Sequence, residues 1–178
     1  FDAGAANCCA AHMGDDSGLF HLAAGVTSVR DPANMNDKLE ELRRKIDAGI
    51  VAGPRIQAMG FIEGRSPFSA RLGFVVDSLD AAKRAADWYA ERGFIQLKLY
   101  NSIKPEWAKP LAAYAHAKGL RVSGHVPAFM RAEEAVRAGY DELTHINQMM
   151  LNFFVKPTDD TRTLLRFTLA SDFAWAAN

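Results

Sequence analysis

Three side chains that can do chemistry, Lys98, His125 and His145, each lie five or six residues after a glycine. A glycine in this position is typical of the left-handed residue that ends a helix. An apolar run of strand length separates each glycine from its reactive side chain. Neutral imidazole binds zinc and other divalent metals, and a desolvated lysine amine is a nucleophile. The spacing therefore predicts a site at the ends of three successive strands.

The elements that must position these side chains are predicted to be alternating strands and helices. Strands are predicted in five β-branched or apolar runs, at residues 26–29, 54–59, 94–100, 120–125 and 140–146. Helices are predicted where apolar residues recur at helical spacing, at residues 19–24, 37–47, 80–92, 105–118, 133–138 and 163–176. Residues 60–73, rich in glycine and serine, are predicted to form a long loop. This alternation indicates βα units on a parallel sheet, within one domain that spans residues 1–178.

Lys98 shares one face of its predicted strand with Gln96 and Tyr100, because alternate strand residues point the same way. A lysine that faces the inside of a barrel is either ion-paired, a Schiff-base nucleophile or a carbamylated metal ligand. Histidines at matching positions on the next two strands can converge with it on one point. The three together favour a metal site. His21 and His116 are interpreted as surface or packing residues.

Composition excludes several other classes of function. The chain has 178 residues, 49% of them hydrophobic, which is enough for a sizeable core. Its net charge is zero, so we expect no binding to nucleic acid or to an anionic membrane, and no apolar run is long enough to span a bilayer. The two cysteines, Cys8 and Cys9, are adjacent and predict neither a disulfide nor a zinc site. No signal-peptide pattern is visible, and the compartment stays undetermined.

Five segments together resemble the strand ends of the metal-dependent amidohydrolase superfamily, in its imidazolonepropionase-like and dipeptidase-like branch. They are residues 24–31, 53–56, 96–100, 123–127 and 144–146, in the same order as in the family. The resemblance implies an α/β fold of the (β/α)8 TIM-like barrel type. A whole barrel of this class takes about 250 residues. The chain is therefore expected to hold only about strands 1–6.

The resemblance also implies a metal centre and a reaction. Lys98 would be carbamylated and bridge one or two divalent ions, with zinc expected, while His125, His145 and His12 would be further ligands. The metal-activated water would hydrolyse an amide, peptide or cyclic amide C–N bond of a small molecule. Tyr100 is the candidate for contacting that substrate. No residue is assigned as the catalytic acid or base.

Two departures from the family pattern keep alternatives open. The first strand should carry a His-x-His pair, but Ala10 stands where the first histidine is expected, and no eighth-strand aspartate is found. One alternative is a truncated or degenerate barrel piece without catalysis, and another is an aldolase-like enzyme that uses Lys98 as a Schiff base. Unpaired strand edges favour association, so a homo-oligomer is also considered. The substrate stays open, although Arg65 and Arg71 in the predicted loop are either solvated or able to pair with a carboxylate.

Overall fold

The computed structural model describes residues 17–176, and the six strands in this part of the chain all pair in parallel. They are β1 (Ser28–Asp31), β2 (Arg55–Gly64), β3 (Phe74–Val76), β4 (Gln96–Leu99), β5 (Arg121–Gly124) and β6 (Glu142–Leu143). The sheet has the order β1-β2-β4-β5-β6, and β3 pairs with the far end of β2. The sheet is curled and its described outer strands, β1 and β6, do not pair with each other. The predicted α/β fold, part of a TIM-like barrel, is confirmed.

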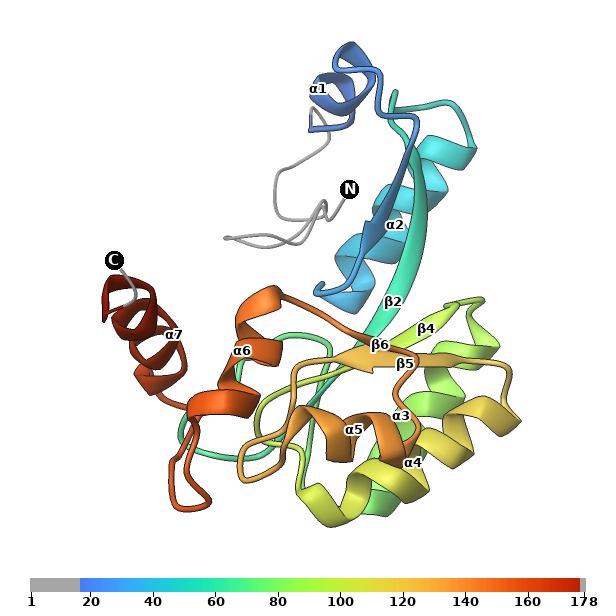
Figure 1. The fold of residues 1–178 in the computed structure, drawn as a ribbon. Helices are drawn as coiled ribbons and strands as arrows, with labels where there is room; N and C mark the ends of the chain where they lie inside the picture. Colours follow the sequence, from blue (N-terminus) through green and yellow to red (C-terminus); the bar gives the residue numbers. More distant parts are fainter. Residues whose placement is uncertain (1–16, 177–178) are drawn as a thin grey trace.

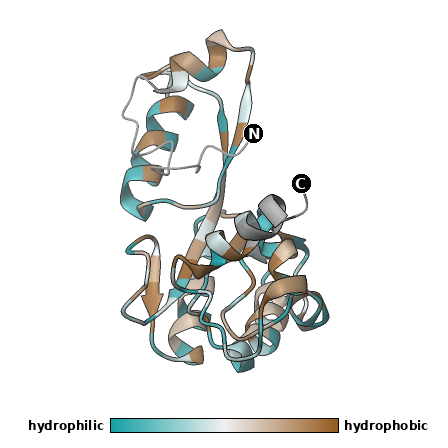
Figure 2. Cartoon of the chain, turned by 60° about the vertical axis from the view of Figure 1, so that its left-hand side comes forward, coloured by the Kyte–Doolittle hydropathy of each residue, from teal (hydrophilic) through white to brown (hydrophobic). Residues whose placement is uncertain are grey.

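Seven helices accompany the strands in the described residues. They are α1 (Ser17–Ala23), α2 (Asn36–Asp47), α3 (Leu79–Glu91), α4 (Pro105–Ala117), α5 (Ala132–Ala138), α6 (Ile146–Phe154) and α7 (Leu165–Ala176). Figure 1 shows α3, α4 and α5 along one face of the sheet, while α6 and α7 lie together away from that layer. Each helix carries both hydrophobic and hydrophilic residues (Figure 2). This is expected for helices that pack one side against the protein and expose the other side to water.

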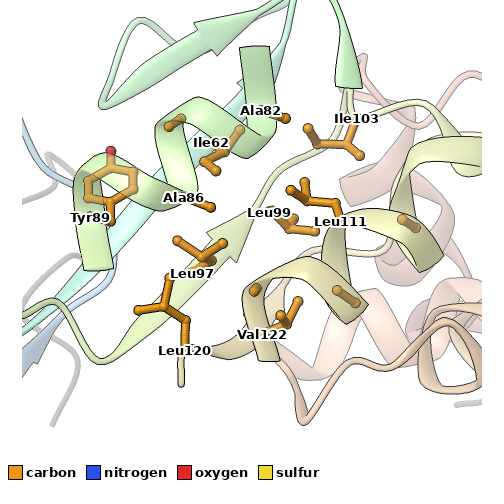
Figure 3. Packing of buried hydrophobic residues seen from close by; sticks show 14 of the residues in the cluster. Ile62, Ala82, Ala86, Tyr89, Leu97, Leu99, Ile103, Leu111, Leu120 and Val122 are labelled. Atoms are coloured by element: carbon orange, nitrogen blue, oxygen red, sulfur yellow. The ribbon is translucent and has the colours of Figure 1, made fainter. Parts of the chain in front are cut away.

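The main core lies between the sheet and α3 and α4. Leu97 and Leu99 of β4 are fully buried and pack among small and apolar side chains of the two helices (Figure 3). Alanines such as Ala82 and Ala86 let α3 approach the sheet closely. A second, smaller cluster holds Val29 of β1 and Leu42 of α2. The assignment of all residues to one domain stays a prediction.

The segment after β6 differs from its prediction. The predicted strand 140–146 is reduced to Glu142–Leu143, and residues that follow it form α6. His145 has a φ of 68°, in the left-handed region, and is the residue that precedes α6. A strand cannot continue through that conformation, so the histidine lies in the turn just beyond the strand. No residue pattern predicts this turn, because the left-handed backbone here belongs to a histidine and not to a glycine.

The predicted loop at residues 60–73 is also partly wrong. Strand β2 continues through its first residues to Gly64, and β3 follows at Phe74–Val76. Glycines suggested a loop, yet Gly60 is needed within the strand because a Cβ there would collide with the ring of Tyr89. Close packing therefore explains a glycine that the sequence pattern attributed to flexibility. No helix in the described part of the chain is long and apolar enough to cross a membrane.

Candidate active site

Strand β4 brings Lys98 into the interior of the curled sheet. Its residues alternate between two surroundings, with the leucines in the helix-covered core and Gln96 and Lys98 on the other face. Lys98 pairs in register with Phe61 on one side and Ser123 on the other, so it lies on a central strand. Its side chain is only 4% exposed. A buried lysine on a central strand is costly unless it is paired or used, which makes it the natural starting point of a site.

His125 follows β5 directly and continues the sheet ladder, because its N–H donates to the carbonyl of Leu99 at 3.0 Å. The preceding Gly124 has a φ of 138°, and a Cβ there would collide with the backbone of Leu99. Only glycine allows the two strands to approach this closely at that conformation. The Ser-Gly-His sequence therefore fixes where the imidazole leaves the strand and places it beside the end of β4.

Hydrogen bonding selects the tautomer of His125. Its Nδ1 lies 2.7 Å from Oδ1 of Asn101, an amide oxygen that can only accept, so Nδ1 is the donor. Nε2 then keeps its lone pair. This atom is buried and has no hydrogen-bond partner in the described part of the chain. A histidine held through one nitrogen, with the other nitrogen unsatisfied, has the arrangement found in metal-ligating histidines.

The electrostatics of the site keep His125 neutral. Burial is the largest cause, and electrostatic interactions with Lys98, His145 and Arg166 add to it, so that the pKa of His125 lies well below its usual range. Only the neutral imidazole has a free lone pair for a metal. At neutral pH the Nε2 of His125 is therefore available as a ligand.

His145 and Tyr100 complete the group around His125. The His145 ring lies edge-on to the His125 ring with centroids 4.9 Å apart, and the Tyr100 ring lies 4.0 Å from His125 on another side. The Lys98 ammonium lies 5.8 Å from the centre of the Tyr100 ring. The structure thus brings together four of the side chains singled out from the sequence. The fifth, His12, lies outside the described residues.

Sequence reasoning missed three residues of this region. Asn101 follows Tyr100 directly and holds His125, while Arg166 lies in α7 and acts on His125 through its charge. Glu63 is the second-last residue of β2, inside the segment predicted as a loop, and it is fully buried. Its carboxylate accepts hydrogen bonds from the backbone N–H groups of Gly64, Ser102 and Ala70. An acidic residue at a strand end was a usable signal, but neither Asn101 nor Arg166 had one.

The residues present fit a divalent metal in part. Histidine, cysteine, aspartate and glutamate side chains of the described residues form no group of three that could hold a metal. The two histidines supply two imidazoles, and one of them has a buried nitrogen without a partner. Lys98 would add a third ligand only as a carbamate. A three-ligand metal site at these side chains therefore requires the carbamylation of Lys98.

Comparison with known proteins supports the fold assignment. No family model and no curated protein matches the sequence. Among solved structures, the chain is similar to a bottromycin amidohydrolase, with a TM-score of 0.67, 22% identity, and coverage of 89% of this chain and 34% of that one. It is also similar to a candidate prolidase from Bifidobacterium longum, with a TM-score of 0.57, 21% identity, and coverage of 87% and 42%. The chain therefore has the fold of part of a (β/α) barrel and spans less than half the length of these two proteins.

Proposed function

We propose that this protein is a metal-dependent hydrolase of amide, peptide or cyclic amide C–N bonds. The observation that carries the proposal is the buried Nε2 of His125, which has no hydrogen-bond partner and whose tautomer is selected by Asn101. Lys98 and His145 lie next to it, at the ends of neighbouring strands where barrel enzymes carry their active sites. The fold similarity to an amidohydrolase and a candidate prolidase adds support from a separate source.

In this proposal His125 and His145 are nitrogen ligands and Lys98 is a ligand after carbamylation. The Lys98 ammonium first releases one proton to water. The neutral amine then attacks the carbon of carbon dioxide, an N–C bond forms while one C–O π pair moves onto oxygen, and a second proton leaves to water, so that a cation becomes a carbamate anion. His12 is the expected further ligand. When bound, a divalent ion, with zinc expected, would lower the pKa of water and polarise the substrate carbonyl. One or two ions are compatible with this set.

The protein side chains have distinct tasks around that centre. Asn101 orients His125, and the burial of Lys98 and His125 keeps bulk water from competing for their polar atoms. Tyr100 borders both and is placed to contact the substrate or the attacking water. It is half-buried, so one part of its ring remains accessible to a ligand.

Elemental analysis of the purified protein, grown with zinc and bicarbonate, tests the proposal. We expect at least one equivalent of zinc or manganese in the wild type and loss of that metal in Lys98→Met and in His125→Ala. His116→Ala is the matched control, because His116 is an exposed histidine bonded to Asp141 on the helical side. It should retain the metal. Hydrolysis of a panel of N-acyl amino acids, dipeptides and cyclic amides should follow the metal content.

Other results identify the alternatives. Absence of metal and of hydrolysis in the wild type would contradict the proposal and favour a non-catalytic barrel piece. Borohydride trapping of a carbonyl substrate on Lys98 would instead support the Schiff-base enzyme. A carbamate signal from labelled carbon dioxide, absent in Lys98→Met, would support the modified lysine directly.

A further inference from the structure

Arg166, in the first turn of α7, lies against the candidate active site. Its guanidinium carbon is 5.9 Å from the centre of the Tyr100 ring and 4.6 Å from that of Phe167. A residue distant in sequence from the strands of the site therefore forms part of its wall.

The guanidinium of Arg166 retains hydrogen-bonding capacity. Its Nε is buried and has no hydrogen-bond partner in the described part of the chain, and no ion pair of Arg166 with a described carboxylate is found. Arg162, one turn earlier, differs in this respect because its Nε and Nη2 donate to the two carboxylate oxygens of Asp160 at 2.8 and 2.7 Å. The planar fork of donors on arginine matches a carboxylate. Unlike Arg162, Arg166 therefore keeps a hydrogen-bond donor that no described carboxylate uses.

The charges around the site favour an anionic ligand. Two cationic side chains, Lys98 and Arg166, lie against the ring of Tyr100, at 5.8 and 5.9 Å from its centre. Carbamylation of Lys98 would reverse one of these charges, and a bound divalent ion would add two positive ones. Even with a carbamate on Lys98, a bound divalent ion together with Arg166 would leave the site with a net positive charge, which a carboxylate on the substrate would offset.

A hollow beside Arg166 adds the second feature of the ligand. Its volume is about 480 Å³. Its lining is partly apolar, from Phe68, Leu164 and Leu165, and partly polar, from Arg162, Thr163 and Arg166. Phe68 and Leu164 are 50% and 76% exposed, respectively, which leaves apolar surface open to water. Covering such surface with an apolar group is favourable. Arg166 lines this hollow and also lies against Tyr100 of the candidate site. One ligand can therefore contact Arg166 with its carboxylate and place an apolar group in the hollow.

We propose that Arg166 is a specificity-determining residue that binds the carboxylate of an amide substrate whose apolar side chain lies in the adjacent hollow. The substrate class is that of N-acyl amino acids and dipeptides with a free carboxylate and an apolar residue. This inference rests on the proposed function for its turnover, while the binding of the carboxylate is independent of it.

Binding to the metal-free full chain provides the first test. N-acetyl-leucine should bind the wild type, and N-acetyl-leucinamide, which lacks the negative charge, should bind about 10- to 100-fold more weakly. Arg166→Met should remove this preference, and Arg166→Lys should restore part of it. Arg137→Met is the control, because Arg137 is an exposed arginine on α5 that should leave the preference intact. Acetate and inorganic phosphate should bind more weakly than N-acetyl-leucine, since neither reaches the hollow.

Turnover by the metal-loaded protein provides the second test. For the carboxylate substrate, Arg166→Met should raise KM by about 10- to 100-fold with a smaller change in kcat, and for the amide analogue KM should stay unchanged. Equal binding of acid and amide by the wild type, or an unchanged preference in Arg166→Met, would overturn the inference. So would loss of metal in Arg166→Met, because the residue would then act through the metal centre. Selective carboxylate binding without any hydrolysis would uphold this inference while contradicting the proposed function.

Discussion

The two faces of β4 carry the same strand geometry but have opposite chemistry. On the face toward α3 and α4, Leu97 and Leu99 are buried among apolar side chains (Figure 3). On the other face, Gln96 and Lys98 are almost as buried, at 3% and 4% exposed, and lie among polar and aromatic groups. Burial by itself therefore does not distinguish a core from a site. The two faces differ in the chemistry of their buried atoms: those of the core are apolar, whereas those of the site are polar and can bind a ligand.

The comparison predicts that the helix-covered face determines stability. Leu97→Ala should lower the free energy of unfolding by about 2–5 kcal/mol, because the surrounding core cannot collapse fully into the cavity. Urea denaturation measures this change. Val136→Ala, on the exposed side of α5, should alter it by no more than about 0.5 kcal/mol. Similar losses in both variants would show that the sheet and helices are not packed as described.

Glu63 sharpens the comparison, because it is a buried carboxylate at the end of a neighbouring strand. Burial raises its pKa to about 7 from 4.5, although three backbone N–H donors oppose the shift. The folded chain therefore binds more protons than the unfolded chain between these values. The contribution of Glu63 to stability is largest below about pH 4.5 and falls as the pH rises to about 7, by about 3 kcal/mol in all.

Glu63→Gln should remove that fall, because the amide does not ionise. Urea denaturation of wild type and variant at about pH 5 and about pH 8 measures the difference, in which the other titrating groups cancel. Glu133→Gln, at an exposed carboxylate on α5, should keep the wild-type slope. An unchanged slope in Glu63→Gln would mean that the carboxylate is better solvated than its burial indicates.

The smallest effect is expected from the ion pair between the two outer strands. Arg30 of β1 donates from both Nη atoms to the carboxylate of Glu142 on β6, at 2.7 and 3.1 Å, and Gln96 of the central strand also bonds to it. Both charged side chains are partly exposed, so water and salt weaken the pair. A double-mutant cycle with Arg30→Met and Glu142→Gln should give a coupling energy below about 1 kcal/mol, decreasing with added salt. A coupling several times larger would show that the pair holds the curled sheet together.

Much of the fold and of the candidate site was predictable from local patterns. The strands at β4 and β5 follow from apolar runs bounded by glycine and proline, and these patterns operate over a few residues. Lys98 and His125 could be placed because each ends such a run. The prediction for His145 was correct in its location near His125 but wrong in its element, since the residue lies in a turn with a left-handed backbone.

Other parts could not be predicted, because they depend on contacts between distant segments. The extension of β2 past Gly60 depends on the ring of Tyr89, which excludes any side chain at that position. The role of Asn101 depends on the approach of β5 to the turn after β4. The position of Arg166 depends on how α7 returns to Tyr100, and helical periodicity gives no information on that docking.

The sequence by itself determined the order of most elements, the parallel α/β architecture and four of the side chains around the candidate site. It could do so because propensity, alternation and glycine positions act locally along the chain. Only the tertiary structure decided which polar atoms are buried without partners, which tautomer His125 adopts and which arginine lies beside the site. All three depend on contacts between segments that are far apart in the sequence. Burial changes the energy of a charge or a lone pair only after those segments have packed together.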